Sequence, residues 1–139
     1  MIAAARFAGA WRLEREIEDR LGGQVLRGEG VARFDGIGPE LRYHEELVLT
    51  LPGAAAPVRA ERRYLWRFGA GRVAVFFDDG LPFHAFVPEG HGAGTDHPCG
   101  ADLYRVAYDF SRFPGWQAVW TVTGPRKDYT SRTSYRPAP

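Results

Sequence analysis

Apolar and polar residues alternate along most of the chain, which is the period of a β-strand with one buried and one solvated face. In the first such segment Trp11 and Leu13 lie on the apolar face, while charged side chains lie on the other. The exception is Arg15, which interrupts the apolar series. The pattern predicts a first strand that ends near Asp19, preceded by one short helical turn within residues 1–9.

Eight further segments show strand-like patterns and are separated by turns rich in glycine, proline and aspartate. They span residues 24–34, 41–51, 58–68, 72–77, 81–87, 99–110, 116–122 and 127–136. The segments 72–77 and 81–87 are apolar on both faces, so their pattern does not tell which face is buried. Residues 88–98 are rich in glycine and predict a loop, and no helix is predicted after the last strand.

Nine short strands with short connections predict an antiparallel sheet of the up-and-down type. An open sheet of this size would leave two exposed edges, which closure removes. We therefore expect an all-β, closed or nearly closed barrel, formed by a single domain over residues 1–139. Gly28 and Gly30 lie within one predicted strand, and we interpret them as a bend or a close backbone approach rather than as a phosphate loop.

Charged residues interrupt the apolar faces of three predicted strands, namely Arg15, Glu45 and Arg62. Asp102 joins them if the aromatic face of its strand, which carries Tyr104, is the buried one. An unpaired buried charge is costly, so these groups must pair, reach solvent or meet a charged ligand. One interpretation is a balanced internal network of two acids and two bases. The other is a fork of two arginines for a carboxylate or phosphate head group.

The candidate ligand-binding residues are these charges and the aromatic side chains beside them. They are Arg15, Glu45, Arg62, Tyr64, Trp66, Asp102 and Tyr104. They favour the binding of a small, partly apolar ligand, which the arginines would prefer as an anion. The alternative is a small barrel enzyme of isomerase or hydratase type that uses Tyr104 and Asp102 as acid and base. Because no nucleophile motif is present, we assign no catalytic residue.

Composition narrows the partners and the location of the protein. Its 18 basic and 17 acidic residues are interspersed and give a formal net charge of +1, which predicts neither a nucleic-acid nor a membrane partner. The single Cys99 permits no internal disulfide and no signal peptide is evident, so we expect a cytoplasmic protein. The four histidines match no closed zinc spacing, and no metal or cofactor is expected. The oligomeric state does not follow from the sequence.

The run Gly9-Ala10-Trp11 resembles the G-x-W signature that opens the first strand of lipocalins and of the wider calycin group. This resemblance implies that Trp11 closes one end of the barrel and is covered by an arginine. Arg132 and Arg136 are the candidates for that arginine.

The predicted absence of a C-terminal helix is more similar to the helix-poor relatives of lipocalins, such as nitrobindin. That likeness implies haem binding as a further alternative. The runs 59–68, 99–105 and 124–129 resemble an uncharacterised bacterial family of lipocalin-like domains. The resemblance covers nearly the whole chain and implies a fold, but no activity.

Overall fold

The computed structural model describes residues 1–139 and contains one short helix and eleven strands. The helix α1 spans Ala4–Phe7, as the sequence predicts. The strands are β1 (Gly9–Asp19), β2 (Gln24–Asp35), β3 (Glu40–Thr50), β4 (Val58–Gly69), β5 (Arg72–Phe77), β6 (Pro82–Phe86), β7 (His91–Ala93), β8 (His97–Cys99), β9 (Asp102–Asp109), β10 (Trp116–Gly124) and β11 (Lys127–Pro137). The nine predicted strands are confirmed, whereas β7 and β8 lie where we expected only a loop. No helix is long and apolar enough to cross a membrane.

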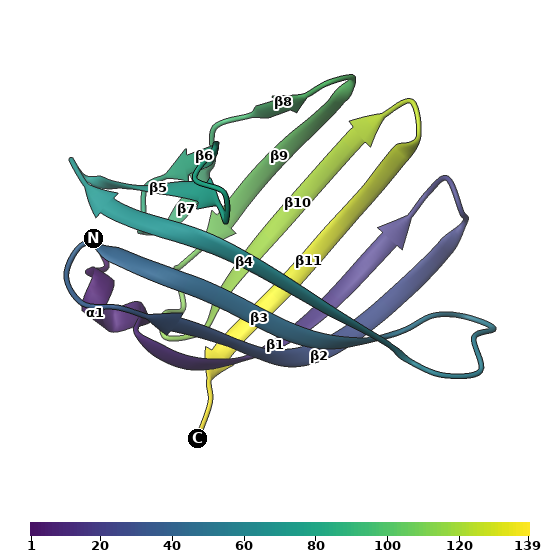
Figure 1. Ribbon diagram of the computed structural model, residues 1–139, viewed down its shortest axis with the longest axis horizontal. Helices are drawn as coiled ribbons and strands as arrows, with labels where there is room; N and C mark the ends of the chain where they lie inside the picture. Colours follow the sequence, from purple (N-terminus) through teal and green to yellow (C-terminus); the bar gives the residue numbers. More distant parts are fainter.

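All strands belong to one antiparallel sheet with the order β6-β5-β4-β3-β2-β1-β11-β10-β9-β7, and β8 also pairs with β9. The two edges of this sheet meet through Thr95, whose backbone N–H donates to Ala85 O at 2.9 Å and whose Oγ1 accepts from Ala85 N at 2.9 Å. Gly94 N donates to Val106 O on β9. The sheet is therefore a nearly closed up-and-down barrel without a C-terminal helix, which confirms the predicted fold (Figure 1).

Aromatic rings fill one end of the barrel, which we call the aromatic end. It contains Phe7, Trp11, Phe34, Trp66, Phe110, Phe113 and Trp116. Phe7 extends from α1, which lies across this end (Figure 1), and its ring centroid is 5.3 Å from that of Phe113 and 5.5 Å from that of Trp66. The indole Nε1 of Trp11 donates to Phe7 O at 2.8 Å and so ties α1 to β1.

The prediction that an arginine covers Trp11 is wrong. Arg132 and Arg136 alternate with the buried residues of β11, so both side chains lie on its exposed outer face. Trp11 is covered instead by the ring of Phe113, at a centroid distance of 5.8 Å. Arg6 lies over the other ring of this pair, with its guanidinium carbon 5.0 Å from the centroid of Phe113.

The opposite end of the barrel, which we call the Arg62 end, is only half-buried. Its half-buried inner-face side chains include Ile17, Leu49, Ala60, Arg62, Tyr104, Trp120 and Tyr129, whereas Val122 beside them is completely buried. The strand β5 pairs with β4 only from Tyr64 to Gly69. The segment Val58–Arg63 of β4 consequently has a β-strand partner on one side only, and solvent reaches the inner face there.

Local irregularities explain where the period-2 pattern succeeds and where it fails. A Cβ atom at Gly30 would collide with the backbone oxygen of Glu46, so the predicted close approach of backbone is confirmed. Between β5 and β6 the register shifts, and Phe83 is the extra residue of a bulge. Phe83 and its neighbour His84 are therefore both buried, which alternation alone does not predict.

Candidate functional site

An ion pair occupies the middle of the barrel. Arg15 donates from Nη1 to Glu45 Oε2 at 2.6 Å and from Nη2 to Glu45 Oε1 at 2.8 Å. Its Nε donates to Thr133 Oγ1 at 2.8 Å, and both charged residues are buried. Burial alone would raise the pKa of Glu45, but the hydrogen bonds and charge of Arg15 hold it below its usual value. Arg15 is thus neutralised by the protein itself and is not free for a ligand.

Two tyrosines extend this pair into a directed chain of hydrogen bonds. The hydroxyl of Tyr43 lies 2.6 Å from Glu45 Oε1 and 2.8 Å from the hydroxyl of Tyr135. Because an ionised carboxylate only accepts, Tyr43 donates to Glu45, and Tyr135 then donates to Tyr43. Burial raises the pKa of Tyr135 to about 12, so it stays protonated at neutral pH. A lone pair of the Tyr135 hydroxyl remains available as an acceptor.

Arg62 is the second predicted arginine, and it has no such partner. It is the cross-strand neighbour of Glu45 on the inner face, yet it makes no hydrogen bond or ion pair with any carboxylate. Its guanidinium carbon lies 4.9 Å from the ring centroid of Trp120, and the residue is half-buried. Of the two predicted bases, only Arg15 is therefore held by a carboxylate, whereas Arg62 interacts with Glu45 through its charge alone.

Asp102 pairs with a residue that the sequence analysis missed. Its Oδ2 lies 3.3 Å from Nζ of Lys127, and the same Nζ donates to the hydroxyl of Tyr104 at 2.9 Å. These hydrogen bonds, to Tyr104 first and then to Asp102, raise the pKa of Lys127. Lys127 is the only lysine of the chain, and this composition signal could have singled it out.

Tyr129 shows that these groups share one end of the barrel. Burial is the main cause that raises its pKa, followed by Tyr104, while the charges of Arg62 and Lys127 act in the opposite direction. Tyr104, Lys127 and Arg62 thus all lie close enough to influence one side chain of β11. The structure therefore brings the predicted Asp102 and Tyr104 together on an unpredicted lysine, and it places Arg62 on the inner face at the same end of the barrel.

A small, partly open cavity of about 20 Å³ lies between the two ends. Ten of its thirteen lining residues are hydrophobic, and they include the predicted Tyr64 and Trp66. His84 also lines it and shares a hydrogen bond of 2.7 Å between its Nε2 and the hydroxyl of Tyr108. Burial lowers the pKa of His84 to about 3, which keeps the ring neutral at physiological pH. Sequence reasoning missed His84 because the bulge hides the orientation of its strand.

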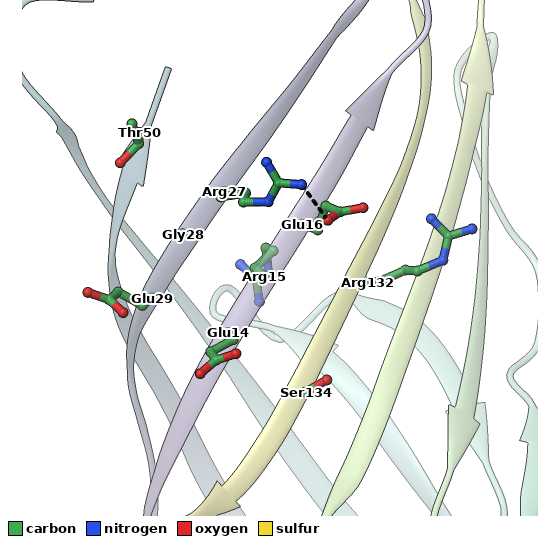
Figure 2. Close-up of a pocket in the computed structure, with 9 residues that line it drawn as sticks. All are labelled: Glu14, Arg15, Glu16, Arg27, Gly28, Glu29, Thr50, Arg132 and Ser134. Atoms are coloured by element: carbon green, nitrogen blue, oxygen red, sulfur yellow. Dashed lines mark hydrogen bonds and ion pairs between the residues drawn. The ribbon is translucent and has the colours of Figure 1, made fainter. Parts of the chain in front are cut away.

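The outer face of β1, β2 and β11 carries a larger hollow of about 510 Å³ (Figure 2). None of its nine lining residues is hydrophobic. Arg27 and Glu16 form an exposed ion pair there at 3.2 Å, which contributes little. Arg15 borders the hollow, but its guanidinium binds Glu45 inside the barrel. This surface therefore has no group of buried polar side chains that point toward one ligand position.

One group of side chains has ligand atoms spaced as a metal site requires. His44, Glu46 and Glu61 lie on the outer face of β3 and β4 with these atoms within 4.8 Å of one another. Nε2 of His44 lies 3.1 Å from Glu61 Oε2, and Arg63 lies 3.8 Å from the same carboxylate. The group is largely exposed, and the neighbouring guanidinium opposes a bound cation.

Comparison with known proteins places this barrel in a family. The family model described as a family of unknown function, DUF6314, matches residues 7–137. The chain belongs to the DUF6314 family. This confirms the resemblance to an uncharacterised family that the sequence suggests. No curated protein sequence matches the chain.

Among solved structures, the DUF6314 chain is similar to the S-type phycobiliprotein lyase CPES from Guillardia theta. The TM-score is 0.65 at 7% sequence identity, over 97% of this chain and 90% of that chain. At this identity the likeness shows the fold alone. It agrees with a calycin-like barrel for the DUF6314 family.

Proposed function

We propose that this protein binds a small amphipathic anion at the Arg62 end of its barrel. The observation that supports this proposal is the unpaired, half-buried guanidinium of Arg62 on the inner face. Partial burial costs this charge hydration, and no protein carboxylate forms a hydrogen bond or ion pair with it, although the charge of Glu45 attracts it from a distance. A carboxylate or phosphate group of a ligand would supply the missing partner through paired hydrogen bonds.

The surroundings of Arg62 suit the apolar part of such a ligand. Trp120 lies under the guanidinium, and Tyr64 and Leu49 are half-buried inner-face residues nearby in the barrel. Half-buried aromatic rings can bury further area against a ligand. The segment Val58–Arg63 pairs with β3 but not with β5, and its free edge gives access from solvent. The predicted residues Arg15, Glu45 and Trp66 then hold the barrel below the ligand and do not contact its charged group.

The size of the interior restricts how deeply the ligand enters. A cavity of about 20 Å³ has room for about one water molecule. A porphyrin is far larger, so we do not extend the haem alternative to this protein. The ligand is therefore placed above the ring of Trp120 and not in the middle of the barrel. A cytoplasmic location for this binding stays a prediction.

The enzyme alternative has one observation in its favour. Lys127 contacts both Asp102 and Tyr104, so an acid and a base lie together at the same end of the barrel as Arg62. The similar structure from Guillardia theta is also named as a lyase. Turnover of a bound anion that is lost in both Asp102→Asn and Tyr104→Phe, at unchanged stability, would favour catalysis over binding alone.

Thermal unfolding tests the binding proposal directly. Decanoate, dodecanoate and glycerol 3-phosphate serve as probes, since they vary the head group and the apolar tail. We expect at least one probe to raise the Tm of the wild type with the logarithm of its concentration. Arg62→Leu should abolish this rise. Arg63→Leu is the matched control, because Arg63 is the next residue of β4 but points outward, and it should keep the rise.

Two results would contradict the proposal. One is an equal response of Arg62→Leu and the wild type to every probe, which would place the anion elsewhere. The other is a Tm for the wild type that no probe changes. In that case Arg62 would have no role in binding amphipathic anions.

A further inference from the structure

Two buried nitrogen atoms without a hydrogen-bond partner belong to residues that line the small cavity. They are Nε1 of Trp116 and Nδ1 of His84, and no other buried side-chain nitrogen or oxygen lacks a hydrogen bond. Trp116 is 2% exposed and His84 is 6% exposed. Buried polar atoms without partners are rare in folded proteins, and each one needs an explanation. Here the two residues that carry these atoms line the same cavity.

The directions of the neighbouring hydrogen bonds define what the cavity can accept. The indole N–H of Trp116 can only donate, so it requires an acceptor. On the same wall, Tyr135 donates its proton to Tyr43 and keeps a lone pair, and its ring stacks on Trp116 at a centroid distance of 3.7 Å. The cavity thus offers both a donor and an acceptor, which is the combination that a water molecule matches.

The electrostatics of the cavity select a neutral occupant. Arg15 and Glu45 also line it, but each neutralises the other through two hydrogen bonds. His84 is uncharged at physiological pH because burial lowers its pKa. An ion in this position would have no opposite charge to compensate its loss of hydration.

We infer that the cavity is a second binding site, directly below the Arg62 end, that holds one neutral water-sized molecule accepting a hydrogen bond from Trp116 Nε1. A volume of about 20 Å³ is sufficient for one water and too small for a larger molecule. In the protein as it exists in water, the occupant is water. Bound there, it joins the Arg15–Tyr135 chain to the indole of Trp116.

This site also limits the chemistry of any larger ligand. A ligand whose tail reaches below Trp120 must replace the bound water with an uncharged acceptor, such as a carbonyl or ether oxygen. A second anionic group is excluded at this depth. The inference rests only on the residues that line the cavity, so it does not depend on whether Arg62 binds an anion.

Nuclear magnetic resonance of the indole groups tests the inference on the unmodified protein. With ¹⁵N-labelled tryptophan, the Hε1 proton of Trp116 should show a cross-peak to water that arises from a long-lived bound molecule. Hε1 of Trp11 is the internal control, because it donates to Phe7 O at 2.8 Å and should show no such cross-peak. Loss of one indole resonance in Trp116→Phe assigns the signal.

A crystal structure provides the second measurement. We expect an isolated density peak within about 3.2 Å of Trp116 Nε1 in the wild type, and its loss in Trp116→Phe. The absence of both the cross-peak and the density would show a dry cavity and would overturn the inference. Density for a molecule larger than water would overturn it as well. Neither result depends on the response of Arg62→Leu to anions.

Discussion

The two ends of the barrel both contain aromatic residues, but they differ in how closely these residues are packed and how far they are buried. At the aromatic end, rings from α1 and from several strands pack closely, and the indole of Trp11 is satisfied by a backbone oxygen. At the Arg62 end, aromatic side chains such as Trp120 and Tyr104 are half-exposed and lie among charged groups. The first arrangement maximises burial, whereas the second leaves surface that a ligand can cover.

This difference teaches that stability and binding are separated along the barrel axis. The pair of Arg15 and Glu45 lies between the ends, and the two charges bind each other through two hydrogen bonds. We therefore assign this pair a role in stability, as we do the aromatic end. Arg62 is only one cross-strand position away from Glu45 but lacks a partner. Substitutions of Arg15, Glu45 or residues of the aromatic end should therefore mainly lower the free energy of unfolding. Substitutions at the Arg62 end should mainly change the response to ligands.

The largest loss of stability is expected from Phe7→Ala. Phe7 is completely buried among aromatic rings, and truncation of such a residue costs about 3–5 kcal/mol. Leu49→Ala at the Arg62 end should cost less than about 2 kcal/mol, because Leu49 is only half-buried. Denaturant unfolding measures both changes. Equal losses would remove the distinction between the two ends.

Arg15→Leu should destabilise the protein by about 3–5 kcal/mol, because it leaves the carboxylate of Glu45 buried and unpaired. The double variant Arg15→Leu/Glu45→Leu should recover much of this loss, as a double-mutant cycle would show. Since the pKa of Glu45 is lowered by folding, its contribution is present at neutral pH and is lost on acidification. A double variant no more stable than Arg15→Leu would contradict this account.

A smaller effect is expected from the pH dependence of His84. Its pKa is about 3 when folded and about 6.5 when unfolded, so the unfolded chain binds a proton first as the pH falls. Stability is therefore complete above pH 6.5 and falls by up to about 1.4 kcal/mol per pH unit below it. His84→Gln should flatten the curve between pH 6.5 and 5. An unchanged slope would show that His84 is not the group responsible.

The smallest effect on stability is expected at the Arg62 end itself. Lys127 is exposed and its partner Asp102 is only partly buried, so Lys127→Met should change the free energy of unfolding by less than about 1 kcal/mol. Differential scanning calorimetry is sufficient to measure this. A loss as large as that of Arg15→Leu would mean that Lys127 belongs to the structural network.

The strands were predictable from sequence because one face of each long strand is buried. In β1 and β2 the alternation of buried and exposed residues is nearly complete, and Arg15 was predicted as an interior charge from its parity alone. The position of a residue in the alternation along its strand tells which side of the sheet it faces. It does not identify the partner of that residue across the barrel. The pair of Arg15 and Glu45 was thus one of several options, and the pair of Asp102 and Lys127 was not foreseen.

Other features could not be predicted because they depend on local irregularity. The bulge at Phe83 turns His84 inward against the alternation, which concealed a residue of the cavity wall. The short strands β7 and β8 pair with β9 through backbone groups, and their sequences show no alternation of apolar and polar residues. Arg132 and Arg136 were candidates for the cover of Trp11 by family resemblance, although the alternation along β11 places both on the outer face.

The central claim is that ligands bind at the Arg62 end, and the four indole groups report on it within one experiment. Trp120 lies under Arg62, whereas Trp11, Trp66 and Trp116 are buried toward the aromatic end. On titration with decanoate, we predict that the indole resonance of Trp120 shifts in a saturable way while that of Trp11 stays fixed. The shift should disappear in Arg62→Leu and persist in Arg63→Leu. A saturable shift of Trp11 with Trp120 unchanged would contradict the account.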